Sequence, residues 1–411
     1  MVLNVMIDIS IFYIWEAIMK GRNTIRNILW GTILGCVFFR PFIFEKTLYI
    51  PNLKLEGILF LASLIYILNA RPKISYNSLD KIIFLFFLTV TASVLSSPHK
   101  NLNAALQYTS LFLLYYITRI SERQEKNALL LTIIISAICI SLYSLYGLLY
   151  LSRYTLEYMH QHNINYLFAE EFLGRRRAFY PFISPNLLAG YLIMVIMICV
   201  GMFFDKLKTK NLHFYISLIC ISISLVVLFL TKSVGGWTVF IICLFLFMLK
   251  SGFLNKKMWF LFVFLIIMLG VIIAIRARSP QYFTKPSFSV EKRLTYWKET
   301  ANIIRSHPFL GVGIGNFHLK ESRTAHNSYL QIWAETGILG IVWWLWIVAI
   351  FIKRGIKNIF SRKEKYFYAG IFAGGVSFLL HNLIDFSFFV GQVAFLWWII
   401  LGLTTHKDML D

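Results

Sequence analysis

Charged residues are scarce in this chain. Only 14% of the 411 residues are Asp, Glu, Lys or Arg, against roughly 25% in soluble domains, and 58% are hydrophobic. This composition excludes an ordinary water-soluble globule and indicates a membrane protein. The few charges are unbalanced, with 40 Lys and Arg against 19 Asp and Glu. The excess does not indicate nucleic acid as a partner, because membrane proteins concentrate cations in short loops that face the cytoplasm.

Cysteine is scarce too. The five cysteines lie singly inside apolar runs, at Cys36, Cys139, Cys199, Cys220 and Cys243. This pattern is typical of small buried residues and argues against a disulfide framework or a zinc site. The sequence also lacks a P-loop, a dinucleotide-binding fingerprint and a detectable internal repeat. We therefore expect no metal, no cofactor and no ATP-driven chemistry.

Long apolar runs predict an all-α polytopic membrane protein with about twelve transmembrane helices, since a crossing needs about 20 residues. The runs occupy residues 28–44, 55–70, 81–97, 104–119, 128–151, 187–204, 213–230, 235–250, 258–275, 328–352, 367–383 and 388–403. Residues 1–19 are apolar but contain Asp8 and Glu16, which predicts an interfacial helix. The alternative is a thirteenth crossing, which would put the N-terminus outside.

The basic residues predict the orientation. With twelve crossings, every connection on the side of the termini contains Lys or Arg, so the positive-inside rule places both termini in the cytoplasm. Two long loops, 152–186 and 276–327, then face outside. We divide the chain into N-terminal membrane helices (1–275), a large external loop (276–327) and C-terminal membrane helices (328–411). Both long loops are basic, which indicates an anionic ligand; the alternative is that their cations meet lipid phosphates.

The first external loop contains three consecutive arginines, Arg175, Arg176 and Arg177. Neighbouring side chains diverge, so only one or two of them can bind one phosphate through the planar guanidinium. The others are equally suited to ending a span and reaching toward headgroups. Pro185 and Asn186 predict the start of the next helix, with Pro in the first turn and Asn as cap.

The second external loop contains a stretch, Val290 to Ser306, without Gly or Pro, which predicts an amphipathic helix on the membrane surface. Arg293, Tyr296 and Trp297 share one face of it. A cation beside two aromatic rings suits a phosphate with an attached sugar. The alternative is an interfacial helix whose aromatic residues lie at headgroup depth.

A glycine-rich segment and a histidine follow. Gly311, Gly313 and Gly315 allow a tight turn or a close approach to a ligand. His326 precedes a predicted span and is the best candidate for a general base, because an imidazole is able to accept a proton at neutral pH; the alternative is a helix cap. Glu335 lies half a turn around that helix from His326, so it is not a direct partner, and its burial implies a partner elsewhere.

The order of these motifs resembles the O-antigen ligase and O-antigen polymerase superfamily. The matching residues begin at Arg177, and the first third of the chain resembles the family only in hydropathy. They are Arg177, Pro185, Asn186, Ala189, Arg293, Trp297, Pro308, Gly311, Gly313, Gly315, Asn316, His326, Asn327, Leu330, Glu335, Gly337, Gly340, His381 and Asp385.

The resemblance implies a bacterial inner-membrane glycosyltransferase that needs neither metal nor cofactor. Its substrates would be a glycan on polyprenyl (undecaprenyl) diphosphate and an acceptor hydroxyl on a lipid or glycan. Arg293 and one of the three consecutive arginines would hold the diphosphate, and His326 would activate the acceptor. Where many members have Ser-Arg-Gly, this chain has Lys232 followed by Ser233, so Lys232 would replace an Arg without its two-pronged grip.

Supporting roles are expected for Asn327, Trp297, Tyr296, Glu335, His381 and Asp385. His381 and Asp385 lie four residues apart on a helix, which predicts a structural hydrogen bond; the alternative is a second proton-handling pair.

Ligation of O-antigen to lipid A-core, in lipopolysaccharide biosynthesis, is the function we favour, and polymerisation of O-antigen or exopolysaccharide repeat units is the alternative. A transporter is the alternative from another class. Transporters concentrate charges and broken helices at the bilayer midplane, whereas the cations here crowd the external side. The expected partners are the donor, the acceptor and membrane lipids, and no nucleic acid.

Overall fold

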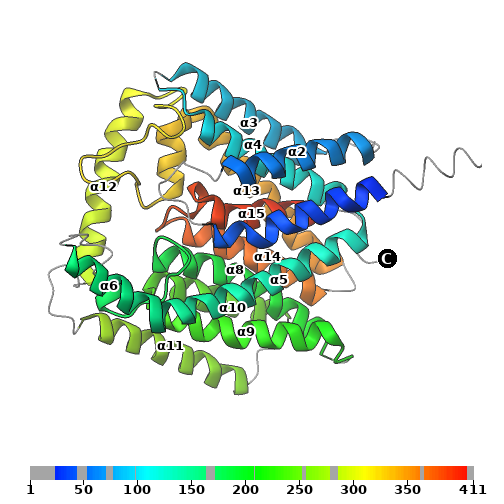
Figure 1. Ribbon diagram of the computed structural model, residues 1–411, viewed down its shortest axis with the longest axis vertical. Helices are drawn as coiled ribbons and strands as arrows, with labels where there is room; N and C mark the ends of the chain where they lie inside the picture. The colour runs from blue at the N-terminus through cyan, green and yellow to red at the C-terminus, as the bar shows by residue number, and fades with distance from the viewer. Residues whose placement is uncertain are drawn as a thin grey trace, which may run out of the picture.

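A computed structural model describes most of the chain, namely residues 24–43, 53–70, 77–97, 99–162, 172–207, 209–251, 256–277, 286–361 and 365–404. These residues form helices joined by turns and loops, and this described part contains no strand. The predicted all-α fold is confirmed (Figure 1). The predicted interfacial helix at residues 1–19 lies outside the described residues.

A helix lies at each of the twelve predicted spans. The first covers residues 24–39. The others are α2 (Leu53–Ala70), α3 (Ser78–Ser96), α4 (Leu102–Ile120), α5 (Arg123–Tyr146), α8 (Pro185–Asp205), α9 (Leu212–Leu230), α10 (Val234–Ser251), α11 (Lys256–Ala277), α13 (Ser328–Ser361), α14 (Lys365–His381) and α15 (Gly391–Thr404).

Six helical stretches in the described ranges are long and apolar enough to cross a membrane. They are Ser78–Ser96, Arg123–Gln161, Pro185–Asp205, Leu212–Leu230, Trp259–Arg276 and Ser328–Ile359, and Val234–Leu249 and Gly391–Thr404 are apolar but shorter. The polytopic character follows from these helices, whereas twelve crossings stay a prediction.

Polar caps set the helix starts. Before α3, the side chain of Asn77 accepts a hydrogen bond from the backbone N–H of Asp80 (3.0 Å), and the Asp80 carboxylate accepts one from the N–H of Asn77 (2.8 Å). At α8 the cap is Ser184, whose hydroxyl accepts from the N–H of Leu187 (3.3 Å). The predicted cap, Asn186, lies one residue inside the first turn.

Helices α8, α14 and α15 form the centre of the bundle, and α8 is buried along most of its length. Close contact between α8 and α14 depends on Gly201 and Gly370, because a Cβ atom on Gly201 would lie 2.7 Å from the Cα of Gly370. Small residues of this kind let helices pack where lipid offers no hydrophobic driving force. The start of α8 and the end of α14 both line the cavity that lies under α12 (Pro286–Ser306).

Two ion pairs lie inside the bundle. Arg40 Nη2 lies 2.5 Å from Glu56 Oε1, and both side chains are fully buried. Asp80 contacts Arg119 (2.7 Å) and accepts a hydrogen bond from the Tyr115 hydroxyl (2.7 Å). Pairing is what an apolar environment demands of charges, because an isolated ion there loses its hydration without compensation.

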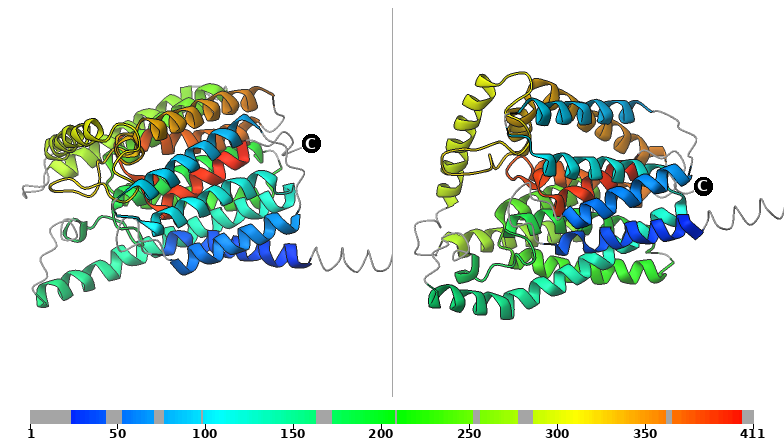
Figure 2. Two further views of the ribbon diagram at one scale, coloured as in Figure 1. Left: turned by 90° about the horizontal axis from the view of Figure 1, so that it is seen from above. Right: turned by 45° about the horizontal axis from the view of Figure 1, so that its top comes forward.

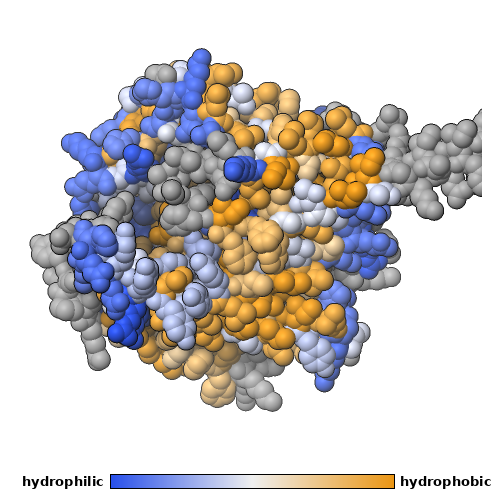
Figure 3. Space-filling view, viewed as in Figure 1, coloured by the Kyte–Doolittle hydropathy of each residue, from blue (hydrophilic) through white to orange (hydrophobic). Residues whose placement is uncertain are grey.

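Helix α12 (Pro286–Ser306) lies where a helix was predicted in the second long loop, and its amphipathic character stays a prediction. It runs across the end of the bundle opposite to the C-terminus, at the left of Figure 1, and both views of Figure 2 show it outside the bundle. A broad apolar band separates the hydrophilic surface at this end from that at the other end (Figure 3). This distribution matches a bundle that spans a membrane, with α12 at one surface.

The first long loop differs from the prediction. Residues 152–161 are helical, because α5 continues through a π-helical turn, η2 (Gly147–Leu151), into α6 (Ser152–Gln161). The turn places Tyr180 against Gly147, where a Cβ atom would lie 2.8 Å from the Cβ of Tyr180. The hydroxyls of Tyr180 and Thr155 are 3.2 Å apart. The end of the loop thus packs back onto this long helix.

The positive-inside rule and the position of α12 generate a labelling prediction. Arg153 on α6 and Lys320 after α12 are exposed at the end where α12 lies, and Lys353 is exposed near the opposite end of α13. An impermeant thiol reagent, applied to intact cells with any outer membrane permeabilised, should label Arg153→Cys and Lys320→Cys but not Lys353→Cys. The unsubstituted chain gives the background from its own cysteines. Labelling of Lys353→Cys alone would reverse the orientation.

Candidate active site

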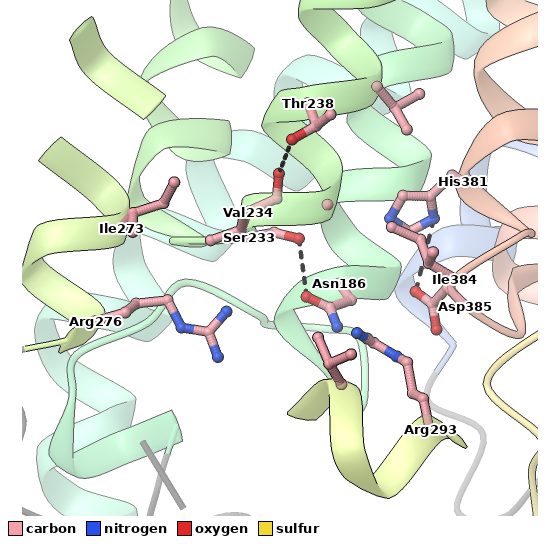
Figure 4. Close-up of a pocket in the computed structure, with 13 residues that line it drawn as sticks. Asn186, Ser233, Val234, Thr238, Ile273, Arg276, Arg293, His381, Ile384 and Asp385 are labelled. Atoms are coloured by element: carbon pink, nitrogen blue, oxygen red, sulfur yellow. Dashed lines mark hydrogen bonds and ion pairs between the residues drawn. The ribbon is translucent and has the colours of Figure 1, made fainter. Parts of the chain in front are cut away.

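A cavity of about 370 Å³ lies under α12, where the ends of five helices meet. Its lining comes from α8, α10, α11, α12 and the end of α14 with the turn that follows (Figure 4). The lining residues are Asn186, Ser233, Val234, Gly235, Thr238, Val239, Ile273, Arg276, Val290, Arg293, His381, Ile384 and Asp385. Apolar side chains thus surround a small set of charged and polar groups, as in many ligand sites.

Two arginines face this cavity. Arg293 comes from α12 and Arg276 from the last turn of α11, and in Figure 4 both guanidinium groups extend into the space next to Asn186. Burial lowers the pKa of Arg293, and the nearby carboxylate of Asp385 opposes that shift. The Nε of Arg293 is buried and has no hydrogen-bond partner among the described residues. Guanidinium groups suit anions with several oxygen atoms, so two of them in one largely apolar cavity make it a candidate anion site.

Asp385 supplies the negative charge of the cavity. Its Oδ2 lies 3.6 Å from Nδ1 of His381, which is longer than a good hydrogen bond. Ser387 Oγ is 3.5 Å from the same nitrogen. Within the described ranges Oδ2 of Asp385 accepts no hydrogen bond, although it is buried. A buried carboxylate oxygen of this kind is available to an incoming proton donor or to a charged intermediate.

His326 lies beside the cavity, between two aromatic rings. Its imidazole is stacked on Tyr296 of α12, with ring centres 5.9 Å apart, and meets the edge of Phe386 at 5.2 Å. Removal from water lowers the pKa of His326 to about 4; Asp385 raises it and Arg293 lowers it further. Its Nδ1 is buried without a hydrogen-bond partner in the described structure. The imidazole is therefore neutral at pH 7 and free to accept a proton.

The loop that carries His326 is tied to both neighbouring elements. Trp297 Nε1 on α12 donates to the carbonyl of Ala325 (3.1 Å). The side chain of Asn327 caps α13 by accepting from the N–H groups of Tyr329 and Leu330 (3.0 and 3.1 Å). These contacts give Trp297 and Asn327 structural roles that hold the loop against α12 and α13.

Asn382, which sequence analysis missed, joins the same loop to the end of α14. Ser328 Oγ donates to Asn382 Oδ1 (2.5 Å), and the N–H of Ser328 donates to the carbonyls of Asn382 (2.9 Å) and Asp385 (3.1 Å). Asn382 Oδ1 also accepts from the N–H of Phe388 (2.8 Å). Ser328, two residues after His326, is thereby fixed next to Asp385.

The three consecutive arginines and Lys232 form a second cationic cluster that does not line the cavity. Lys232 Nζ donates to the carbonyl of Arg175 (2.7 Å), and burial and the three arginines lower the pKa of Lys232. Arg177 is buried, and its Nε donates to the carbonyl of Thr231 (2.9 Å). Arg176 has a left-handed φ of 48° and is exposed. Arg177 is thus buried beside Thr231 while its neighbour Arg176 is exposed, so these two side chains diverge.

The glycine-rich segment packs into a break in α13. Gly337 has φ 66°, and a Cβ atom there would overlap the carbonyl of Phe309. The N–H groups of Val312 and Gly313 donate to the carbonyls of Ala334 (2.9 Å) and Glu335 (3.0 Å), and the N–H of Ile338 donates to that of Pro308 (2.8 Å). The segment thus satisfies backbone groups that the break frees, as lipid requires.

Asn186, Ser233 and Arg276 belong to the site, although sequence analysis did not select them. Ser233 Oγ donates to Asn186 Oδ1 (2.8 Å) at the cavity wall. Asn186 and Ser233 belong to motifs noted in the sequence, but a helix cap explained Asn186 and a turn explained Ser233 without any role in a site. Arg276 stood at a predicted span boundary, where a cation that reaches for headgroups is the ordinary interpretation.

The fold and this site define a polytopic helical membrane protein with a cationic cavity at one end of its bundle. Residues 219–345 match the family model described as O-antigen ligase. The matched segment includes Arg276, Arg293, His326 and Glu335. This match supports the resemblance to that superfamily that the sequence predicted. The comparisons with curated proteins and with solved structures found no match.

Arginine geometry generates the second prediction. Arg293→Lys and Arg276→Lys keep the charge but lose the two-pronged contact, so each should weaken binding of polyprenyl diphosphate to the purified protein by about tenfold or more. Arg305→Lys is the matched control, because Arg305 is exposed on the same helix as Arg293. Loss of binding in Lys232→Gln with none in Arg276→Lys would move the anion site to the second cluster.

Proposed function

We propose that the protein is a membrane glycosyltransferase that moves a glycan from a polyprenyl diphosphate donor to an acceptor hydroxyl. The observation that carries the proposal is the meeting of Arg276, Arg293 and Asp385 in one cavity next to a neutral His326. The O-antigen ligase domain supports membrane glycosyl transfer as the reaction class. The lipid-diphosphate donor, independence of metal and the individual residue roles are parts of the proposal.

In this reaction the two arginines stabilise the leaving group. When the acceptor oxygen attacks the anomeric carbon, the carbon–oxygen bond to the diphosphate breaks and its electron pair stays on the diphosphate. The growing negative charge needs preorganised cations, and Arg293 and Arg276 supply them in a site of low dielectric constant. Tyr296 stacks on His326, and we assign to it a contact with the first sugar of the donor.

In this reaction His326 accepts the proton of the acceptor hydroxyl. Its neutral imidazole takes the proton from the attacking hydroxyl, and Asp385 stabilises the imidazolium that results, since Asp385 already favours the charged form. A pKa of about 4 makes His326 a weak base in the free protein. A bound diphosphate adds negative charge nearby and raises that pKa toward the working range.

The setting of the reaction follows from the same proposal. The protein lies in the bacterial inner membrane with both termini cytoplasmic, and the cavity under α12 faces the periplasm or cell exterior. The acceptor we favour is the hydroxyl of a lipid A-core, in line with the ligase description of the matched family. The donor's apolar chain lies against the bundle, where many large apolar side chains are exposed on α11, including Phe260 and Phe264.

Substitution of His326 tests the proposal directly. His326→Ala and His326→Gln should each reduce glycan transfer by about 10² to 10⁴-fold, because both remove the base, while donor binding changes little. The assay is transfer of a lipid-linked oligosaccharide to acceptor by purified protein in detergent with EDTA present. Robust transfer by the Gln variant would leave His326 only a structural role. Absence of transfer by the unsubstituted protein with every acceptor tried would favour a transporter.

The pKa of His326 generates a pH prediction. The neutral form is the active one, and it persists in the free protein down to about pH 4. The profile of kcat/KM against pH should therefore be flat through pH 6.5, where an unperturbed histidine would titrate. The profile of kcat should fall at a higher pH than that of kcat/KM, since the bound diphosphate raises the pKa. A fall in kcat/KM centred near pH 6.5 would contradict a desolvated His326.

A further inference from the structure

A chain of three hydrogen bonds, two of them buried, connects the glycine-rich segment to the residue before His326. The N–H of Ala325 donates to Gln331 Oε1 (3.1 Å), and Gln331 Nε2 donates to Glu335 Oε1 (2.9 Å). The N–H of Gly315 donates to Glu335 Oε2 (3.0 Å). Gln331 and Glu335 are fully buried in the first turns of α13. The carboxylate that sequence analysis left without a partner is thus the centre of this chain.

The direction of every hydrogen bond in the chain is fixed. Backbone N–H groups stand at both ends, and they only donate. Gln331 must therefore turn its oxygen toward Ala325 and its nitrogen toward Glu335, and Glu335 must accept on both oxygens. An ionised carboxylate does so, whereas an amide at position 335 has one oxygen and cannot accept from both sides. The chemistry of the chain thus demands an acceptor-only group at Glu335.

The backbone at His326 needs such support. His326 has φ 49°, a left-handed conformation that is unfavourable for a residue with a Cβ atom. It persists only when both flanks are held. Asn327 and Ser328 hold the following side through the α13 cap and the end of α14. Gln331 holds the preceding side through the N–H of Ala325.

We propose that Glu335 and Gln331 are positioning residues for the reaction, which keep His326 in its left-handed conformation against Tyr296 and beside Asp385. This inference rests on the proposed role of His326. Both side chains are fully buried and bonded to each other, so we assign them an effect on His326 and no contact with the substrate. Their loss displaces the base while the two arginines of the cavity stay in place.

The test exchanges the two side chains. Glu335→Gln leaves the new amide N–H facing a second donor, either the Gln331 amide or the N–H of Gly315. Gln331→Glu places a second carboxylate in contact with that of Glu335. The double variant Gln331→Glu with Glu335→Gln restores every direction: the carboxylate at 331 accepts from Ala325 and from the amide at 335, whose oxygen accepts from Gly315. Each single variant should lower kcat by tenfold or more with KM for the donor little changed, and the double variant should recover kcat to within about threefold.

Ser93→Ala is the matched control. Ser93 Oγ donates to the backbone carbonyl of Glu335 (2.6 Å), so this variant removes a buried hydrogen bond at the same residue and leaves the side-chain chain intact. It should keep kcat near that of the unsubstituted protein. An equal loss of kcat in Ser93→Ala would reduce the role of Glu335 to general stability. Wild-type kcat in Glu335→Gln, or a folded double variant that stays inactive, would overturn the inference.

A second readout does not depend on transfer. The rate at which diethylpyrocarbonate modifies His326, mapped by mass spectrometry, reports how well its ring is enclosed. Both single variants should raise this rate and the double variant should restore it. If the unsubstituted protein shows no transfer, the proposed function fails while this measurement still decides the positioning role. An unchanged rate in Glu335→Gln would overturn that role by itself.

Discussion

The break of α13 at Gly337 is the constraint on which the site depends. A helix interrupted near a membrane surface frees backbone groups that lipid cannot satisfy. The segment from Pro308 to Gly313 fills that need and is thereby fixed against Ala334 and Glu335. The same glutamate then holds Gly315 and, through Gln331, the residue before His326. The break and the glutamate beside it thus hold both ends of the segment between α12 and α13.

Burial affects the pKa values of the charged groups in the site more than ion pairing does. Arg293 and His326 lie within each other's influence, and desolvation lowers the pKa of both. Asp385 opposes the shift in each case, so a single carboxylate moderates the cation and the imidazole together. In the proposed function, the diphosphate of the donor binds next to both groups. Binding of the donor would complete the charge balance and raise the basicity of His326 in the same step.

Much of this architecture could be predicted from the sequence. Apolar runs marked all twelve predicted spans, and the stretch from Val290 to Ser306, which lacks Gly and Pro, marked α12. These signals are local, because hydropathy and helix-breaking residues act on nearby residues. The shared face of Arg293, Tyr296 and Trp297 also followed from helical spacing, and all three turn toward the site. The cap of α8 and the helix at residues 152–161 did not follow. Ser and Asn are equally good helix caps, so the sequence did not decide between Ser184 and Asn186. The helix at residues 152–161 depends on packing against Tyr180, which is distant in the sequence.

The sequence by itself determined the class of fold, the family resemblance and the identity of the charged groups, since composition, period and motif order are all properties of the chain. Only the tertiary structure decided which charges meet. It brought Arg276 beside Arg293, turned Lys232 toward the carbonyl of Arg175, and made Glu335 an acceptor for Gly315 and Gln331. Apart from the Gln331–Glu335 bond within α13, those contacts join segments that are far apart in the sequence. Their partners are chosen by how the helices pack, and no local pattern of residues contains that information.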